Sequence, residues 1–555
     1  MARTNSFGRG DAAVGGFCGY CATGRPYGRD RDPDFLIMAF ASKNQVRGGR
    51  LVALITLIDG MSACWFGYCQ GVFAGVLVSQ DFLDLFPEIN NGSISGAVTS
   101  SFFLGAFVGA VLAFILGDRL GRKKTIIAGH VLNTIGAALQ ASAYSLPHLV
   151  IGRTLNGIGI GVTSTMSPVY LGECVKPHLR GRLLVIGASS NVASFALANW
   201  INYALAFRGG ALQWRLPLAI QLIFPFIIFP IAPFVPESPR WQLLVGRDDE
   251  AKRVISLLNN ESVAADSVMT DYNSIKASIS LERSHRVPLM DVLRNRDKTQ
   301  NLRRLLLSCG TQFMQQFTGI NSLGFYLPTL LHESVGFDLQ TSKLLAAVNG
   351  TIYFIAAFFS LAVVDRLGRR KLMLYGSLAM TACHLISSLS LKTAQEDPAK
   401  MKTFGNVTVA FFVIYHAVFA PTWAGIPWVY AAEVNSLGWR SRGAAAATAT
   451  NWVTGFAVVQ FTKVGIDNLQ WAFFLIFAIL CLLFFPVVYC FYPETAGRKL
   501  EDMDEMFLRN PSWFVFGKKE MTQPTRPQAF VDAEMARISD SEVTIVEVTP
   551  DKTEK

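Results

Sequence analysis

The sequence predicts an all-α membrane protein in which twelve transmembrane helices form two pseudo-symmetric six-helix bundles. Three observations point to this fold class. Hydrophobic residues occupy 51% of the 555 positions and charged residues only 16%, a balance typical of chains that cross a membrane many times. Apolar runs long enough to span a bilayer as helices recur throughout the chain. The first six runs and the last six carry the same short motifs, about 250 residues apart.

The chain begins with a polar tail. Residues 1–49 are rich in Gly and Arg and lack the apolar core of a signal peptide. We therefore expect a disordered cytosolic segment, with Met38 as an alternative start of translation. Cys18 and Cys21 form an isolated CxxC pair without a second pair or a nearby histidine, so we expect no metal and no cofactor.

Twelve apolar spans follow the tail. Their expected limits, in chain order, are about 51–78, 94–117, 124–144, 147–171, 183–207, 215–235, 302–331, 343–364, 371–392, 405–431, 444–465 and 469–492. Because the number of spans is even, both termini lie on the same side of the membrane. The resulting divisions are a first bundle at 50–241, a cytosolic linker with short helices at 242–301, a second bundle at 302–498 and a polar, disordered cytosolic tail at 499–555.

The loops between spans predict the orientation. Basic residues crowd the loops after spans two, four and eight, whereas the loop between spans one and two is acidic and has no Lys or Arg. An excess of positive charge marks the cytosolic side, so we expect a multi-pass plasma-membrane protein with both termini in the cytosol. Asn91, in the motif Asn-Gly-Ser, then lies outside the cell and can accept a glycan. The net charge of +10 is explained by this topology signal and does not predict nucleic-acid binding.

Charged motifs repeat between the two halves. GDRLGRKK at 117–124 returns as VDRLGRRK at 364–371, and PESPRW at 236–241 returns as PETAGR at 493–498. Internal repeats of six spans are typical of transporters that rock two bundles about a central site. The charges can pair between bundles when the cytosolic side is shut; alternatively, they only set topology. These candidate gate residues are Asp118, Arg122, Glu173, Arg180, Asp365, Arg369, Glu433 and Arg440.

The stretch QFMQQFTGINSLGFY places amides inside an apolar span. Gln312, Gln315 and Gln316 are spaced i, i+3, i+4 and share one helix face. Asn321 and Phe325 lie close to the same face. Amides are costly in hydrocarbon, so they should face a bundle interior or a water-filled cavity. They either hold helices together or, beside these aromatic residues, bind a neutral polyhydroxylated ligand, and we favour the ligand site.

Together the motifs resemble those of a sugar porter of the major facilitator superfamily. The resemblance covers roughly 50–507 and rests on the two DRLGR loops, the run from Glu173 to Arg182, PESPR, QQFTGIN, IPW and PETAGR. The ending YPETAGRKLEDMD resembles the fungal branch of hexose, pentose and glycerol transporters. The resemblance implies a twelve-helix fold, alternating access, and transport of a small-molecule monosaccharide bound between the halves; a hexose is favoured, and a pentose or polyol stays open.

The resemblance also implies roles for individual residues. The implied substrate-binding residues are Gln312, Gln315, Gln316, Asn321, Phe325, Tyr326, Trp428, Asn451 and Trp452. The amides hydrogen-bond sugar hydroxyls, because an amide offers both a donor and an acceptor. Phe325 and Tyr326 form the aromatic pair that closes the outer gate. Trp428 follows a proline that interrupts the tenth helix and forms a wall of the site, with Trp423 as further stacking surface. For Trp428 and Trp452 a lipid-interface belt is the alternative.

Three positions depart from the family pattern and leave the substrate open. The span-five glutamine that usually binds sugar aligns with Ala188, the polar position of span eight with Tyr353, and the early position of span ten with Ala420. Polar residues stand near the first two positions, at 189–191 and at Asn349.

A fourth departure concerns energy coupling. Proton-coupled members carry an Asp in the FGYDxG motif of span one, opposite an Arg of span four. Here those positions are Cys69 and Arg153. A thiol has a reference pKa near ~8.5 and poorly replaces a carboxylate that cycles near neutral pH, so we expect facilitated diffusion rather than proton symport. Asp59, earlier in the same span, keeps symport open, although a helix-end acid is the simpler account.

Two other classes of protein share parts of the pattern. A non-transporting sugar sensor has the same architecture, although sensors usually carry longer cytosolic tails. An enzyme is not expected, because Gly157, Gly159 and Gly161 lie inside a span as packing residues rather than in a nucleotide-binding loop. We expect a monomer embedded in the lipid bilayer.

Overall fold

The computed structural model of this protein describes residues 46–285, 287–498 and 500–523. Helices dominate these residues, and no strand occurs among them. Cys18, Cys21 and Met38 lie outside the described residues, as does nearly all of the expected N-terminal tail. The predicted all-α fold class is confirmed.

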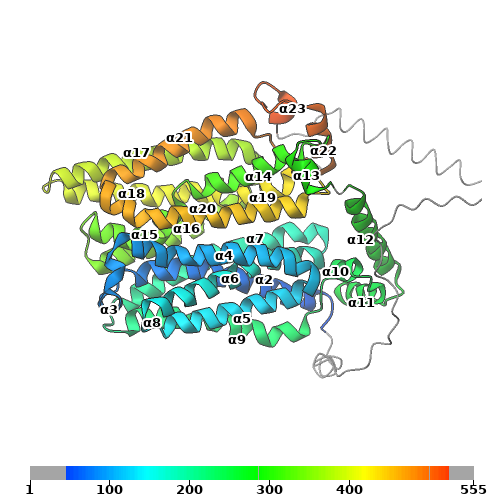
Figure 1. The fold of residues 1–555 in the computed structure, drawn as a ribbon, viewed down its shortest axis with the longest axis horizontal. Helices are drawn as coiled ribbons and strands as arrows, with labels where there is room; N and C mark the ends of the chain where they lie inside the picture. The colour runs from blue at the N-terminus through cyan, green and yellow to red at the C-terminus, as the bar shows by residue number, and fades with distance from the viewer. Residues whose placement is uncertain (1–45, 286, 499, 524–555) are drawn as a thin grey trace, which may run out of the picture. The chain divides into compact units, whose positions relative to one another are not determined.

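The helices of the first half pack side by side as a first lobe (Figure 1). Its elements are α2 (Gly49–Val76), α3 (Gln80–Leu85), η1 (Pro87–Asn90), α4 (Gly92–Leu120), α5 (Arg122–Ala141), α6 (Leu146–Cys174), α7 (Pro177–Leu205), α8 (Leu212–Ile220), α9 (Ile223–Ile231) and η2 (Ala232–Phe234). The linker that follows contains α10 (Pro239–Leu244), α11 (Asp248–Asn259), α12 (Asp266–Ser284) and α13 (Leu289–Leu293).

The second lobe repeats this architecture. Its elements are α14 (Asn301–Gln316), α15 (Ile320–Glu333), α16 (Leu339–Leu367), α17 (Arg369–Glu396), α18 (Met401–Phe419), the π-helical segment η3 (Ala420–Ala424), α19 (Ile426–Val434), α20 (Arg440–Leu469), η4 (Gln470–Ala472) and α21 (Phe473–Phe491). Two short helices follow, α22 (Leu500–Arg509) and α23 (Lys519–Thr522).

Eight helical stretches of the described chain are long and apolar enough to cross a membrane. One of them, Arg440–Phe491, contains both α20 and α21 and therefore two of the expected spans. The other three expected spans are α5, α6 and the pair α14–α15. The first two are diluted by buried polar residues such as His130 and Arg153, and the pair is broken into two shorter helices. The twelve-helix fold is thus reached with three spans of mixed polarity.

The contacts between the lobes follow a two-fold pattern. The second span, α4, packs against the eleventh, α20, and the fifth span, α7, packs against the eighth, α16. Exchanging the two halves converts the first of these pairs into the second. The first span, α2, meets α15 of the seventh, a pair that is its own counterpart. This exchange is what a duplicated six-helix unit produces.

Small residues allow α4 and α6 to pack backbone against backbone. A Cβ atom on Gly157 would lie 2.1 Å from the carbonyl oxygen of Phe102, and one on Gly161 would lie 2.1 Å from that of Ala106. No side chain fits at such distances, so these glycines serve helix packing, as predicted.

The repeated charged motifs build the same helix cap in both lobes. Before α5, Gly121 has φ 95°, a left-handed conformation that suits glycine, and the Glu237 carboxylate accepts the backbone N–H of Arg122 at 2.8 Å. Before α17, Gly368 has φ 85° and the Glu494 carboxylate accepts the first helical N–H at 2.9 Å. The glutamates of PESPR and PETAGR therefore satisfy free N–H groups at helix N-termini. These caps lie at the end of the bundle that holds the basic loops, called the basic end below.

Part of the expected C-terminal tail is folded against the second lobe. Met503, Met506 and Phe507 of α22 are buried, and Asp504 pairs with Arg304 near the start of α14. Their spacing of i, i+3, i+4 gives α22 one apolar face, which the acid-rich composition of the tail conceals.

Candidate functional site

The seventh span is broken inside the amide motif. α14 ends at Gln316 and α15 begins at Ile320, with Gly319 between them at φ 92°. Across this break Asn321 Nδ2 donates to Gln316 Oε1, so amides from two helices meet. A continuous helix would not bring these two side chains together in this way, because they are five residues apart.

Two side chains of the second lobe hold the break in place. The carbonyl oxygen of Thr318 accepts a hydrogen bond from Tyr415 Oη at 3.0 Å and lies 2.8 Å from His384 Nε2. Both residues are buried, and their rings are in contact with a centroid separation of 4.5 Å. The motif alone does not identify them, since they come from spans nine and ten.

The amides of spans seven and eleven bind one another. Asn451 Nδ2 donates to Gln312 Oε1 at 2.7 Å and to Gln315 Oε1 at 2.8 Å. At most 5% of each of these three residues is exposed. Gln312 Nε2 is buried without a hydrogen-bond partner among the described residues. A buried donor left unpaired costs about 1–3 kcal/mol, so this N–H is well suited to a ligand oxygen.

The tenth span contributes backbone rather than side chain to this cluster. Pro427 has no N–H and so cannot bond the carbonyl four residues earlier, which belongs to Trp423. That carbonyl instead accepts Gln315 Nε2 at 2.7 Å, and the next one, of Ala424, accepts it at 2.8 Å. Trp423 is fully buried, whereas Trp428 is 37% exposed. The sequence thus located the interruption, but not that its free carbonyl orients a glutamine.

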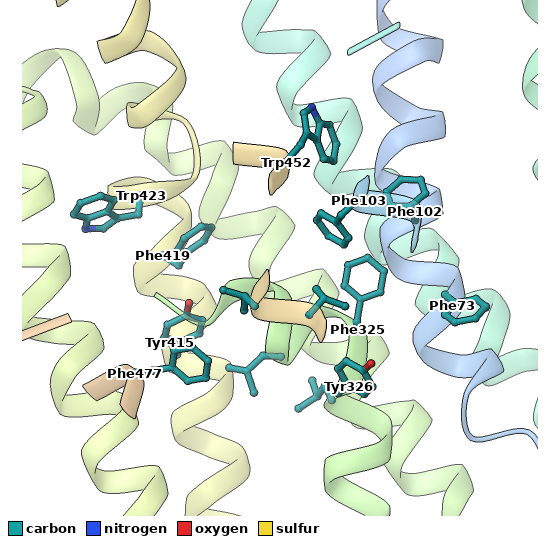
Figure 2. Packing of buried hydrophobic residues seen from close by; sticks show 14 of the residues in the cluster. Phe73, Phe102, Phe103, Phe325, Tyr326, Tyr415, Phe419, Trp423, Trp452 and Phe477 are labelled. Carbon is teal, nitrogen blue, oxygen red and sulfur yellow. The ribbon is translucent and has the colours of Figure 1, made fainter. Parts of the chain in front are cut away.

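Aromatic rings from both lobes gather at the contact between the lobes (Figure 2). The Trp452 ring lies 5.3 Å from Phe66 and 5.9 Å from Phe103, and Phe103 lies 5.4 Å from Phe325, measured between ring centroids. Trp452 is only 1% exposed and Tyr326 is fully buried. Trp452 therefore faces the lobe interface and not the lipid.

Near the positions that depart from the family pattern, Asn349 Oδ1 is buried without a hydrogen-bond partner among the described residues, whereas other polar groups are bound within the protein. Ala188 is exposed. Nearby, Ser190 Oγ donates to its own helix at 2.8 Å and Asn191 Nδ2 donates to the Ala63 carbonyl at 3.2 Å. Tyr353 packs against three aromatic rings, those of Phe195, His416 and Phe419.

Cys69 is buried in a polar network of the first lobe. Its Sγ donates to Asn156 Oδ1 at 3.3 Å and to Gln221 Oε1 at 3.1 Å. Amide oxygens from α6 and from the turn between α8 and α9 thus surround the position of the usual carboxylate.

Arg153 is bound by carbonyl oxygens and an aromatic ring. Its Nε donates to the Val98 carbonyl at 2.9 Å and an Nη donates to that of Thr99 at 3.0 Å. The guanidinium carbon lies 3.5 Å from the centroid of the Phe73 ring. None of these groups is a carboxylate, so in this arrangement the arginine is satisfied without an acid.

Asp59 lies away from that arginine, at the contact between α2 and α7. It is 5% exposed, and a Cβ atom on Gly187 would lie 2.6 Å from Asp59 Oδ2. A separation of ten residues along a helix is about 15 Å, which places it well away from Cys69.

Most of the candidate gate charges pair within one lobe. Arg122 binds Asp118 and Glu173, each at 3.1 Å, and Arg369 binds Glu433 at 3.1 Å. The further candidates are Arg180, which is exposed at the start of α7, Arg440, which begins α20, and Asp365, whose side chain lies outside the described residues.

The side-chain hydrogen bonds that Gln460 and Trp200 make between the lobes lie toward the end opposite the basic loops. Ser100 Oγ donates to Gln460 Oε1 at 2.7 Å, and Gln460 Nε2 donates to the Ser93 carbonyl at 3.4 Å. Trp200 Nε1 donates to Thr351 Oγ1 at 2.9 Å. Sequence reasoning missed these residues, although a single glutamine in the apolar eleventh span was a signal that it needed a partner.

The predicted glycan acceptor is at the same end. Asn91 is exposed and precedes α4, where its Oδ1 accepts the Ser93 N–H at 2.9 Å as a helix cap. Its Nδ2, the atom that would carry a glycan, is not used in this bond.

The chain is similar in sequence and in fold to known membrane transporters. The family model described as "Sugar (and other) transporter" matches residues 55–507. The MFS-type transporter oryC of Aspergillus oryzae is 39% identical over 494 residues, covering 88% of this chain and 92% of its own. The sugar transporter STL1 of Saccharomyces cerevisiae is 31% identical, covering 83% and 82%. Among solved structures, the xylose transporter XylE of E. coli superposes with a TM-score of 0.68 at 23% identity, covering 81% and 99%.

Proposed function

The chain belongs to the sugar transporter family of the major facilitator superfamily, and from that membership we propose that it carries monosaccharides across the plasma membrane by alternating access. A hexose is the favoured substrate, with a pentose or a polyol as alternatives. The observation that carries the proposal is the buried amide cluster of Gln312, Gln315 and Asn451. It combines donors and acceptors from two spans, holds one unpaired donor, and adjoins an aromatic wall shared by both lobes.

The distribution of inter-lobe contacts supports an inward-open conformation. If the basic end faces the cytosol, the bonds from Gln460 to Ser100 and from Trp200 to Thr351 close the outer side. On the cytosolic side, Arg122 and Arg369 are engaged by acids of their own lobes. Re-pairing of these charges across the lobes would accompany closure of that side.

Uptake of radiolabelled sugar tests the proposal. The chain is expressed in a yeast strain that lacks its own sugar transporters, and unlabelled hexoses, pentoses and glycerol compete with labelled glucose. We expect saturable uptake that Gln315→Ala abolishes and that an Asn91→Gln control retains. A protein that reaches the plasma membrane but supports uptake of none of the labelled compounds would be a sensor and not a carrier.

We further propose that transport is facilitated diffusion. Cys69 and Arg153 are each satisfied by neutral partners, so the pair has no carboxylate to load and unload a proton. In de-energised vesicles, sugar uptake should therefore cause no alkalinisation of the external medium.

Proton symport is the second candidate, because Asp59 is a buried carboxylate in the first span. Sugar-driven alkalinisation that disappears in Asp59→Asn would establish symport and overturn the facilitated-diffusion mechanism. Uptake that is unchanged in Asp59→Asn, without alkalinisation, would leave this acid a structural role.

A further inference from the structure

The ten residues after α22, NPSWFVFGKK at 510–519, expose several large aromatic side chains. Trp513 is 41% exposed, Phe514 50% and Phe516 48%. Polar tails normally avoid such residues, and a cluster of exposed aromatic side chains marks an interaction surface. Their exposure is not explained by the transport site, which lies in the spans.

The backbone of this segment is fixed to the end of the last span. Val515 is fully buried, and its N–H donates to the Cys490 carbonyl at 2.8 Å. Met521 is also fully buried, and its carbonyl accepts the Glu494 N–H at 2.8 Å. Because Val515 points inward, its neighbours Phe514 and Phe516 are held outward by the same bonds.

The exposed rings border a broad face of α21 that is itself exposed and apolar, at its two edges, because Tyr489 and Phe491 lie about 200° apart around the helix. Phe514 lies 5.3 Å from Phe491 and Phe516 lies 6.3 Å from Tyr489, between ring centroids. One and two turns further into the span, this face carries the exposed residues Leu482, Leu483 and Val487. In a transmembrane helix such a face is covered by acyl chains, so the rings of 513–516 extend the lipid-facing surface beyond the span. Figure 1 shows α23 near the end of α21.

We propose that residues 510–519 form an interfacial anchor that binds the membrane surface at the basic end. Trp513, Phe514 and Phe516 insert at the boundary between headgroups and acyl chains, where aromatic side chains are favoured. Lys518 and Lys519 follow directly and bind anionic headgroups of the same leaflet.

The anchor is joined to the span that holds the substrate amides. Arg303, which is 1% exposed near the start of α14, donates to the carbonyls of Asn510 and Trp513, each at 3.1 Å. Those carbonyls belong to the anchor itself. A lipid-bound anchor therefore restrains the end of the seventh span, and lipid composition becomes a determinant of how that span moves.

Lipid photocrosslinking tests the anchor without altering the chain. The full-length protein is reconstituted in phosphatidylcholine vesicles, alone or with phosphatidylserine, that contain a phospholipid with a diazirine in its acyl chain. After irradiation, we expect lipid adducts on the peptide that spans 510–519, and more of them when phosphatidylserine is present. The absence of adducts there, with adducts on α21, would overturn the proposal.

Site-specific crosslinking gives a second, independent measurement. Benzoylphenylalanine replaces Phe516 or, as a matched control, Leu281 of α12, which is 49% exposed but belongs to the linker. We expect lipid adducts from position 516 and none from 281. In K518Q/K519Q the increase caused by phosphatidylserine should disappear while the adducts in neutral vesicles persist. Crosslinks from 516 to residues 524–555 or to a second copy of the chain would overturn the lipid assignment. These readouts are independent of transport, so they stand or fall separately from the proposed function.

Discussion

The inter-lobe bonds of Gln460 make the balance between conformations measurable. Gln460→Ala removes the 2.7 Å bond from Ser100 and the longer 3.4 Å bond to the Ser93 carbonyl. Since the second bond is weak, the loss is that of one good hydrogen bond, about 1 kcal/mol or roughly fivefold in an equilibrium constant. In the proposed orientation both bonds close the outer side, at the end opposite the basic loops, so the variant should shift the population toward the outward-open form.

Transport kinetics from the two sides of a vesicle report this shift. A substrate that binds one conformation has an apparent affinity scaled by the population of that conformation. If the inward-open form predominates, as proposed, the half-saturation concentration for influx should fall by up to about fivefold. The value for efflux should rise slightly. An effect on stability or expression alone would lower the maximal rate in both directions and leave the half-saturation concentrations unchanged.

Ser100→Ala provides the matched control. Because Ser100 and Gln460 share one bond, the double variant should resemble the Gln460→Ala variant rather than the sum of the two. An influx half-saturation concentration that rises in Gln460→Ala, or fully additive effects, would refute this account of the closed end.

Three further predictions concern the amides, the coupling position and the linker. Asn451→Ala leaves two glutamine oxygens without their donor, and the half-saturation concentration for uptake should rise at least about tenfold, corresponding to about 1.4 kcal/mol, in the competition assay. Cys69→Asp places a carboxylate at the coupling position of the first span, and uptake should then cause external alkalinisation, measured with a pH electrode. A hydrogen bond from Tyr272, and to a smaller extent one from Lys276, lowers the pKa of Asp248. The charged carboxylate therefore stabilises the contact between α11 and α12 at pH values above the ordinary aspartate pKa. This stabilisation is lost as the pH falls through the lowered pKa. Hydrogen exchange in α12 should accelerate in that acidic window, and Asp248→Asn should remove the pH dependence.

The sequence predicted the parts of this protein that repeat or that violate the apolar pattern. The two DRLGR loops identified the duplicated lobes, and the amides of QFMQQFTGIN identified the cluster that the structure builds around Asn451. Such signals are visible in a sequence because a polar or charged side chain in a membrane is costly unless it finds a partner.

Pairings between distant spans were not predictable in this way. Gln460 and Ser100 are single polar residues separated by 360 positions, and the sequence around either residue does not indicate the other as its partner. The fold of 500–523 was missed for a different reason. The apolar face of α22 consists of only three or four side chains, and the acidic residues between them dominate the composition of this helix.

The freed carbonyl of Trp423 has a consequence for which substitutions can alter the amide cluster. Every amino-acid substitution at position 423 removes the indole but leaves the main-chain oxygen that orients Gln315. Only a change at Pro427, which would supply an N–H to that oxygen, competes for it. Substitutions at position 423 therefore remove a buried indole and its hydrogen bond to the Met373 carbonyl, but they keep the backbone acceptor of Gln315.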